Sequence, residues 1–124
     1  MKHKALIVDD EALLVRTLSQ AFREAGFEVA SAGSAEEALE VYASHAPFDL
    51  IVVDNRLPGK SGLDLLEAVE RPADTRVVLM TAYDTADTHK RSLQLGVDLY
   101  LKKPFDLESL LSKASELVGK GAEA

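Results

Sequence analysis

Acidic residues end two short apolar runs of this sequence. The stretch ALIVDDE places Asp9 and Asp10 directly after Ala5–Val8, and the stretch LIVVD places Asp54 directly after Leu50–Val53. Carboxylates gathered at one point repel one another, so either their pKa values rise or a cation lies among them. Oxygen ligands with no cysteine or histidine nearby favour a hard cation. A site with few protein ligands and room for water suits Mg²⁺.

Two further side chains that suit phosphoryl oxygens also follow apolar runs. Thr81 comes after VVLM and offers a hydroxyl, and Lys103 comes after LYLK and offers an ammonium. A divalent cation and an ammonium neutralise the charge of a transferring phosphoryl group while an ionised carboxylate attacks in line. Each residue alone is more often a helix cap or an ordinary strand residue. Their shared position after strands favours phosphoryl chemistry.

The elements that would position these residues alternate along the chain. Five strand-like runs are each followed by a segment with helical periodicity: Ala5–Val8, Phe27–Ala30, Leu50–Val53, Val77–Met80 and Leu99–Leu101. Repeated strand–helix units predict a parallel sheet with helices on both faces. We predict an α/β, flavodoxin-like doubly wound (βα)5 fold with strand order 2-1-3-4-5. Its ligand crevice lies at the carboxyl ends of strands one and three.

Helix boundaries are also visible in the sequence. The first helix is predicted to end at Gly26, a capping box of Ser34 and Glu37 opens the second, and Asp106 caps the last. Glu11 is predicted to be a first-turn residue of the first helix, with no part in the site.

The fourth helix differs from the others. It is predicted over residues 84–95, with only Ala86, Leu93 and Leu95 as apolar anchors among many polar residues. With so little to bury, it is expected to be the least stable and most movable helix.

Composition limits the possible partners. The chain has 124 residues, a formal net charge of -7 and no cysteine. The negative charge argues against a nucleic-acid or anionic-membrane surface, because either needs a basic patch. The absence of cysteine excludes disulfides and thiolate catalysis. No apolar run is long enough for a signal peptide or a membrane span, so a cytoplasmic location is expected.

Four stretches together resemble the receiver domain of two-component response regulators. They are LIVDDE, DLIVVDNRLPGKSGLDLL, VVLMTAY and LGVDLYLKKPF, and the resemblance covers essentially the whole chain. It implies a receiver domain over residues 1–119 and a short C-terminal tail over residues 120–124. The chain is then either a single-domain regulator of the chemotaxis or sporulation type, or the receiver of a longer regulator. Asn55 and Lys60-Ser61 depart from the usual family residues, which leaves the local loop geometry and partner preference open.

The resemblance assigns a role to each acid. Asp54 looks like the phosphoacceptor, and Asp9 and Asp10 look like the residues that hold Mg²⁺, or Mn²⁺, together with Asp54. Arg56 would contribute its backbone carbonyl to the metal, so its side chain is free for another purpose.

The same resemblance assigns roles at strands four and five. Thr81 and Lys103 look like the hydroxyl and the ammonium that bind the phosphoryl group, and Tyr100 looks like an aromatic switch that turns inward as Thr81 moves. Pro104 matches a proline that follows a cis peptide bond. Lys102 is expected to point away from Lys103 into solvent.

The implied function is a phosphorylation-dependent signalling switch. A histidine kinase or histidine phosphotransfer protein would supply the phosphoryl group. The face of the fourth helix, fifth strand and fifth helix would contact an effector or a second copy, with no direct contact to nucleic acid or membrane. The domain is then no conventional enzyme, but it catalyses its own phosphorylation and slow autodephosphorylation. Leu13 and Thr17 either form part of a donor docking patch or are merely half-buried.

Arg56 and Tyr83 are predicted to hinder the water that removes the phosphoryl group. Two other functions were weighed. A flavodoxin-like cofactor binder shares the fold but needs a phosphate-cradling loop where this chain has VDDE. A Mg²⁺-dependent aspartyl-phosphate phosphatase needs an acid two positions after its nucleophile, where this chain has Arg56.

Overall fold

The predicted alternation of strands and helices is present throughout. The computed structural model describes residues 2–123, with side chains described as far as residue 119. The strands are β1 (Lys4–Val8), β2 (Glu28–Ala32), β3 (Leu50–Asp54), β4 (Arg76–Thr81) and β5 (Leu99–Lys102). The helices are α1 (Ala12–Glu24), α2 (Ala35–His45), α3 (Gly62–Ala68), α4 (Ala86–Gln94) and α5 (Leu107–Glu123). None of the helices in the described range combines the length and apolar character that crossing a membrane requires.

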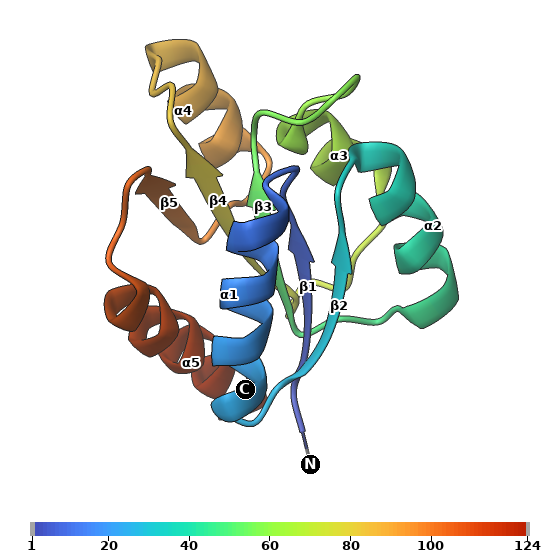
Figure 1. The fold of residues 1–124 in the computed structure, drawn as a ribbon. Helices are drawn as coiled ribbons and strands as arrows, with labels where there is room; N and C mark the ends of the chain where they lie inside the picture. Colours follow the sequence, from blue (N-terminus) through green and yellow to red (C-terminus); the bar gives the residue numbers. More distant parts are fainter. Residues whose placement is uncertain (1, 124) are drawn as a thin grey trace.

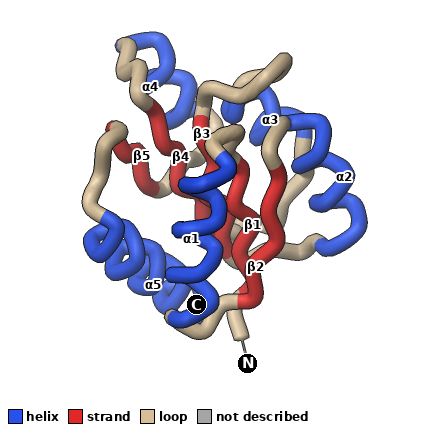
Figure 2. Tube along the Cα trace, viewed as in Figure 1, coloured by secondary structure: helices blue, strands red, loops and turns tan. Residues whose placement is uncertain are grey.

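All five strands form one parallel sheet in the order β2-β1-β3-β4-β5. The predicted fold and strand order are therefore confirmed. Figure 1 shows the strand arrows pointing toward one edge of the sheet, where the loops to the following helices begin. Figure 2 shows the sheet as a central layer between helices.

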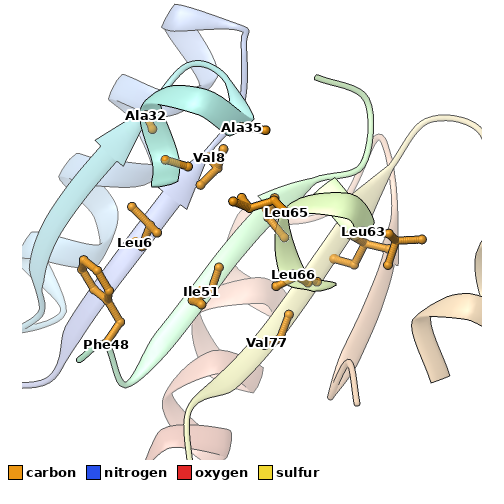
Figure 3. Packing of buried hydrophobic residues seen from close by; sticks show 13 residues of the cluster. Leu6, Val8, Ala32, Ala35, Phe48, Ile51, Leu63, Leu65, Leu66 and Val77 are labelled. Atoms are coloured by element: carbon orange, nitrogen blue, oxygen red, sulfur yellow. The ribbon is translucent and has the colours of Figure 1, made fainter. Parts of the chain in front are cut away.

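Successive residues of β1 and β3 point to opposite faces of the sheet, so the domain has two apolar cores. Ala5 and Ile7 pack with α1 and α5, whose contacts include Phe22 and Leu110. Leu6 and Val8, together with residues of α2, α3 and β3, line the other core. Figure 3 shows this second core, with Ile51 and Leu66 between the labelled neighbours. Each such aliphatic side chain contributes about 1.5–3 kcal/mol when fully buried, and the two cores fix the sheet that positions the strand ends.

β2 begins later than predicted. Phe27 precedes the strand, and its N–H donates to Phe22 O (2.9 Å), so it closes the turn after α1 rather than starting β2. Its ring is buried and meets that of Phe22 edge-on, with centroids 5.2 Å apart. The predicted end of the first helix at Gly26 is confirmed: the residue has φ +98°, a conformation that glycine adopts without a steric penalty.

The predicted caps are only partly as expected. Ser34 Oγ accepts the N–H of Glu37 (3.1 Å), but the Glu37 carboxylate accepts the N–H of Gly33 and leaves the predicted capping box half formed. Asp106 Oδ2 accepts the N–H of Ser109 (3.0 Å), as expected for a cap of α5. α5 continues to Glu123, so the tail boundary at residue 120 stays a prediction, and Ala124 lies outside the described residues.

A complete capping box lies where the sequence departed from the family pattern. Ser61 Oγ accepts the N–H of Asp64, and Asp64 Oδ2 accepts the N–H of Ser61, both at 3.1 Å. Asn55 Oδ1 also accepts the N–H of Leu63 (3.2 Å). The polar residues of this loop therefore satisfy the first N–H groups of α3.

Ser61→Ala is expected to lower the free energy of unfolding by about 1 kcal/mol, because the N–H of Asp64 loses its acceptor. Urea unfolding followed by circular dichroism measures the change. Ser112→Ala, at an exposed position within α5, is the matched control and should be neutral or slightly stabilising. Equal losses in the two variants would contradict the capping role.

α4 is weakly anchored, as predicted, but by other residues than expected. Ala86 is exposed and Leu93 is 67% exposed, so neither is an anchor; Leu95 is half-buried beyond the last helical residue. Ser92 is the buried residue of the helix. Arg91 ties α4 to α3, with Nη2 2.8 Å from Asp64 and 2.7 Å from Glu67. α4 is therefore held by a buried serine and an ion-paired arginine rather than by an apolar stripe.

Candidate functional site

Three predicted acids converge at the carboxyl ends of β1 and β3. The two strands are neighbours, with Val8 aligned to Val53, so the residues that follow them lie side by side. Asp9, Asp10 and Asp54 each offer a carboxylate oxygen, and these oxygens lie within 4.8 Å of one another. Asp9 and Asp54 are buried, whereas Asp10 is exposed. The acids therefore form one acidic crevice that opens to solvent.

The donor set of the crevice fits a hard divalent cation. Asp54 Oδ1 is buried and has no hydrogen-bond partner among the described residues. Each oxygen of Asp9 has a partner and keeps one lone pair for a cation: Oδ1 accepts the N–H of Glu11 (2.9 Å) and Oδ2 contacts Lys103. Clustered carboxylate oxygens, one of them buried without a partner, are the ligands that Mg²⁺ or Mn²⁺ prefers. The residues present thus fit such an ion.

Lys103 brings an ammonium to the acids from the end of β5. Its Nζ lies 2.7 Å from Asp9 Oδ2, 3.3 Å from Asp54 Oδ2 and 3.3 Å from Glu11 Oε1. Burial alone would lower the pKa of Lys103, but the bond to Asp9 and the charges of Asp54 and Asp9 outweigh it and raise the pKa. The backbone N–H of Lys103 donates to Thr81 O (2.8 Å), and the peptide bond to Pro104 is cis, as the resemblance implied.

The surroundings of Asp54 destabilise the ionised form of its carboxyl group. Burial raises the pKa of its carboxyl, the negative charge of Asp9 raises it further, and Lys103 opposes both effects. The ionised form of Asp54 therefore costs free energy in the folded state, a cost that a metal ion or a chemical change at Asp54 can relieve.

Asp54→Asn is expected to stabilise the metal-free domain at neutral pH, on the order of 1 kcal/mol, because it removes the buried charge. Lys103 remains paired with Asp9. A carboxyl with a raised folded pKa destabilises the fold above that pKa. The gain over wild type should therefore be complete above the raised pKa and disappear as the pH falls toward 3.8, the ordinary value. Thermal unfolding of both proteins across this pH range measures it. A wild type more stable than the variant at neutral pH would contradict the assignment.

The predicted switch residues lie on either side of the loop after β4. Thr81 is buried, and its Oγ1 donates to Tyr83 O (3.1 Å) and accepts the N–H of Tyr83 (3.0 Å). Tyr100 is half-buried, and its hydroxyl donates to Asp84 Oδ1 (2.7 Å). Burial, together with the hydrogen bond and charge of Asp84, raises the pKa of Tyr100 to about 12. The loop from residue 81 to 84 therefore connects the two side chains.

The ring of Tyr100 also has a neighbour on α4. His89 of α4 stacks on its ring, with centroids 4.7 Å apart. Lys102 points away from Lys103, as predicted; it is 70% exposed and pairs with Asp84 at 3.0 Å.

Two features of the crevice were not found by sequence reasoning. Glu11 is the N-cap residue of α1 rather than a first-turn residue, and its carboxylate reaches Lys103. Arg56 places its guanidinium 4.1 Å from the centroid of the Tyr83 ring, a contact that was not predicted. Both side chains line the crevice with Asp10 and Asp54, which agrees with their predicted place beside the path of water. The spacing of Glu11 two residues after Asp9 was the available signal, because the turn into α1 brings both carboxylates to the same strand end.

The fold and the site define a class of protein: a doubly wound α/β domain with an acidic crevice and a lysine at the switch point of its sheet. A sequence profile of the response regulator receiver domain matches residues 5–115. The chain belongs to this family, the receiver domains of two-component response regulators, and the predicted resemblance is confirmed.

Among curated relatives, sporulation initiation phosphotransferase F of Bacillus subtilis is 32% identical over 111 residues, which cover 89% of this chain and 89% of that protein. The transcriptional regulatory protein PdtaR of Mycobacterium tuberculosis is 34% identical over 109 residues, which cover 87% of this chain and 53% of that protein. The chain therefore spans about half the length of PdtaR.

Solved structures agree with the fold. A CheY-like receiver domain protein from Methanospirillum hungatei superposes with a TM-score of 0.88 at 27% identity, covering 99% of this chain and 98% of that one. The non-phosphorylated HemR receiver domain from Leptospira biflexa gives a TM-score of 0.85 at 32% identity, covering 94% of each chain.

Proposed function

We propose that this domain is a phosphorylation-dependent switch that accepts a phosphoryl group from a phosphohistidine donor onto Asp54, with Mg²⁺ or Mn²⁺. The observation that carries the proposal is the buried Oδ1 of Asp54, which has no partner among the described residues and lies in a crevice of clustered carboxylates. The lone pairs of this oxygen are therefore available to a metal ion or to phosphorus.

Each residue around Asp54 has a separate role in phosphoryl transfer. Asp9, Asp10 and Asp54 would hold the metal ion, together with the backbone carbonyl of Arg56 that the family resemblance implies. When bound, the ion supplies positive charge that offsets the phosphoryl oxygens. The carboxylate of Asp54 attacks phosphorus as the bond to the donor nitrogen breaks, and the electron pair leaves with that nitrogen. Lys103, which already lies 3.3 Å from Asp54 Oδ2, turns its ammonium to a phosphoryl oxygen.

The new phosphoryl group is then sensed through Thr81. The Thr81 hydroxyl gives up its hydrogen bonds to the Tyr83 backbone and donates to a phosphoryl oxygen instead. This releases the loop that carries Asp84. Tyr100 then loses its hydrogen bond to Asp84 and turns inward. α4 is anchored by few buried side chains, so a change in the loop shifts its position. The face of α4, β5 and α5 is the surface that an effector, or a second copy of the chain, would recognise.

The donor is a histidine kinase or a histidine phosphotransfer protein. An apolar groove lined by Leu14, Pro104, Phe105 and Leu107 lies beside Lys103. Leu13, at 74% exposure, and the exposed Thr17 lie on the same helix, so the alternative that they are half-buried does not hold. An apolar surface next to the reacting group suits a docking helix of the donor. Direct contact with nucleic acid or membrane is not part of the proposal, and a cytoplasmic location fits such a donor.

The decisive experiment is incubation with Mg²⁺ and a small acyl-phosphate donor, followed by intact-mass measurement. Wild type is expected to gain one phosphoryl group, and Asp54→Asn to gain none. Asp74→Asn, at an exposed loop position, is the matched control and should label like wild type. Labelling that survives Asp54→Asn, or that needs no divalent cation, would defeat the proposal.

The Arg56–Tyr83 pair is expected to prolong the phosphorylated state, because it narrows the path by which water reaches Asp54. A cation–π contact at an exposed site is worth about 0.5–1 kcal/mol, so Tyr83→Ala should shorten the lifetime of the label roughly two- to fivefold. Loss of label from purified, phosphorylated protein measures the lifetime. Leu93→Ala, at an exposed position on α4, is the control. Fast loss in wild type, unaltered in Tyr83→Ala, would show that the pair does not obstruct water.

A further inference from the structure

Glu11 brings a charge to the crevice that neither the metal site nor the N-cap accounts for. Its side chain makes no capping hydrogen bond to α1, although it occupies the N-cap position. Among the described residues, the possible metal cluster consists of Asp9, Asp10 and Asp54, without Glu11. The side chain is 65% exposed, its Oε1 lies 3.3 Å from Lys103 Nζ, and it lines the opening of the crevice.

The direction of phosphoryl transfer places the leaving group near this carboxylate. In-line attack puts the leaving atom on the side of phosphorus opposite Asp54. The Asp54 side chain is 6% exposed and lines the same crevice as Glu11, so a phosphoryl group on Asp54 has its opposite side toward the crevice and its opening. Glu11 lines this opening on the α1 side, and Arg56 and Tyr83 line it on the side of the loops after β3 and β4.

From this arrangement we propose that Glu11 selects donors by the charge of their leaving group, favouring phosphoryl groups bound to nitrogen over those bound to a carboxylate. The inference rests on the proposed phosphoacceptor role of Asp54. In a protonated phosphoramidate or phosphoimidazole, the donor portion is cationic. When the phosphorus–nitrogen bond breaks, the electron pair goes to nitrogen, and a neutral amine or imidazole leaves. In an acyl phosphate, the pair goes to oxygen, and a carboxylate anion leaves.

Glu11 therefore attracts the first kind of donor and repels the second. Arg56 acts in the opposite sense from its place over the Tyr83 ring, but its charge is the same in every Glu11 variant, so it does not contribute to the change in the ratio between variants. Lys103 acts on the phosphoryl oxygens, which the two donor classes share, so any movement of Lys103 scales both rates alike. The ratio of the two rates isolates the effect on the leaving group.

Coulomb's law gives the scale of the effect. At a separation of about 6 Å in a water-like dielectric, one unit of charge changes a rate roughly threefold. Glu11→Gln should therefore raise the rate constant for acetyl phosphate relative to that for phosphoramidate about threefold. Glu11→Lys, which changes the charge by two units, should raise the ratio about tenfold. Glu11→Asp keeps the charge and should leave the ratio near that of wild type.

The test measures labelling of Asp54 by intact mass with each donor, in wild type and the three Glu11 variants, at Mg²⁺ concentrations shown by titration to saturate every variant. Glu108→Gln, at an exposed position in the first turn of α5, controls for net charge. A ratio that rises in the order Asp, Gln, Lys at position 11, and stays constant in Glu108→Gln, supports the inference.

Two failures are distinguishable. If neither donor labels Asp54 in wild type, the proposed function fails. If both donors label Asp54 but the ratio is the same in Glu11→Gln as in wild type, or changes equally in Glu108→Gln, the selection of donors by Glu11 is overturned and the phosphoacceptor role of Asp54 stands.

Discussion

Lys103→Met is expected to destabilise the metal-free domain by about 3 kcal/mol, because breaking a buried ion pair leaves uncompensated charge in the interior. The Lys103 side chain is 12% exposed, and its ammonium contacts three carboxylates, of which the Asp9 side chain is fully buried and that of Asp54 nearly so. Methionine has a similar length and fills the space without the charge. Urea unfolding in the presence of a chelator measures the loss.

Three comparisons separate this charge effect from lost packing. Addition of Mg²⁺ should recover much of the stability, since the ion supplies the positive charge that Lys103 provided. In an Asp54→Asn background, Lys103→Met should cost less, because one of the repelling carboxylates is gone. Lys102→Met, which removes a 70% exposed lysine with a single ion pair, should cost at most about 1 kcal/mol. A Lys103→Met loss that Mg²⁺ leaves unchanged would mean that packing, and not charge, is the cause.

Much of the fold follows from local patterns. The interior strands β1 and β3 are buried on both faces, and their unbroken aliphatic runs mark them clearly in the sequence. β2 lies at an edge of the sheet and mixes exposed with buried residues, so its start was predicted one residue early and its end two residues early. Periodicity finds apolar stripes, but the anchors of α4 are polar. Ser92 is buried and donates its hydroxyl to His89 O within the same helix, and Arg91 pairs with Asp64 of α3.

The candidate site also has a part that the sequence predicts and a part that it does not. Asp9, Asp10 and Asp54 were predictable as neighbours because parallel strands end at one edge, and strand order then decides which ends are adjacent. Contacts between Glu11 and Lys103 join residues 92 positions apart and depend on the direction of long side chains. The contact of Arg56 with the Tyr83 ring likewise requires two loops to approach. Such contacts produce no periodic pattern in the sequence, although they determine the charge of the crevice and how easily water and donors enter it.

Gly62 packs against the backbone at Asp54, and Gly62→Ala is the second substitution for which we expect a large loss of stability. Gly62 begins α3, is buried, and donates its N–H to Asn55 O (2.9 Å), so the helix start packs directly on the end of β3. A Cβ atom there would lie 2.4 Å from Asp54 O and 3.0 Å from Asn55 Cα. Both contacts are with backbone, which no side-chain rotation relieves. The backbone must therefore shift, either at the start of α3 or at Asp54.

Gly62→Ala should therefore lower the free energy of unfolding by about 3 kcal/mol, and the displaced Asp54 should label more slowly than in wild type under the conditions that still keep the variant folded. Gly119→Ala is the matched control: it lies within α5 with no atom within 4 Å of the new Cβ, so the same substitution should stabilise by up to about 1 kcal/mol. Opposite signs at the two glycines would show that close backbone approach, and not helix propensity, determines the residue at position 62. A neutral Gly62→Ala would mean that α3 can move away from β3 without cost, and Asp54 would then owe its position to the sheet alone.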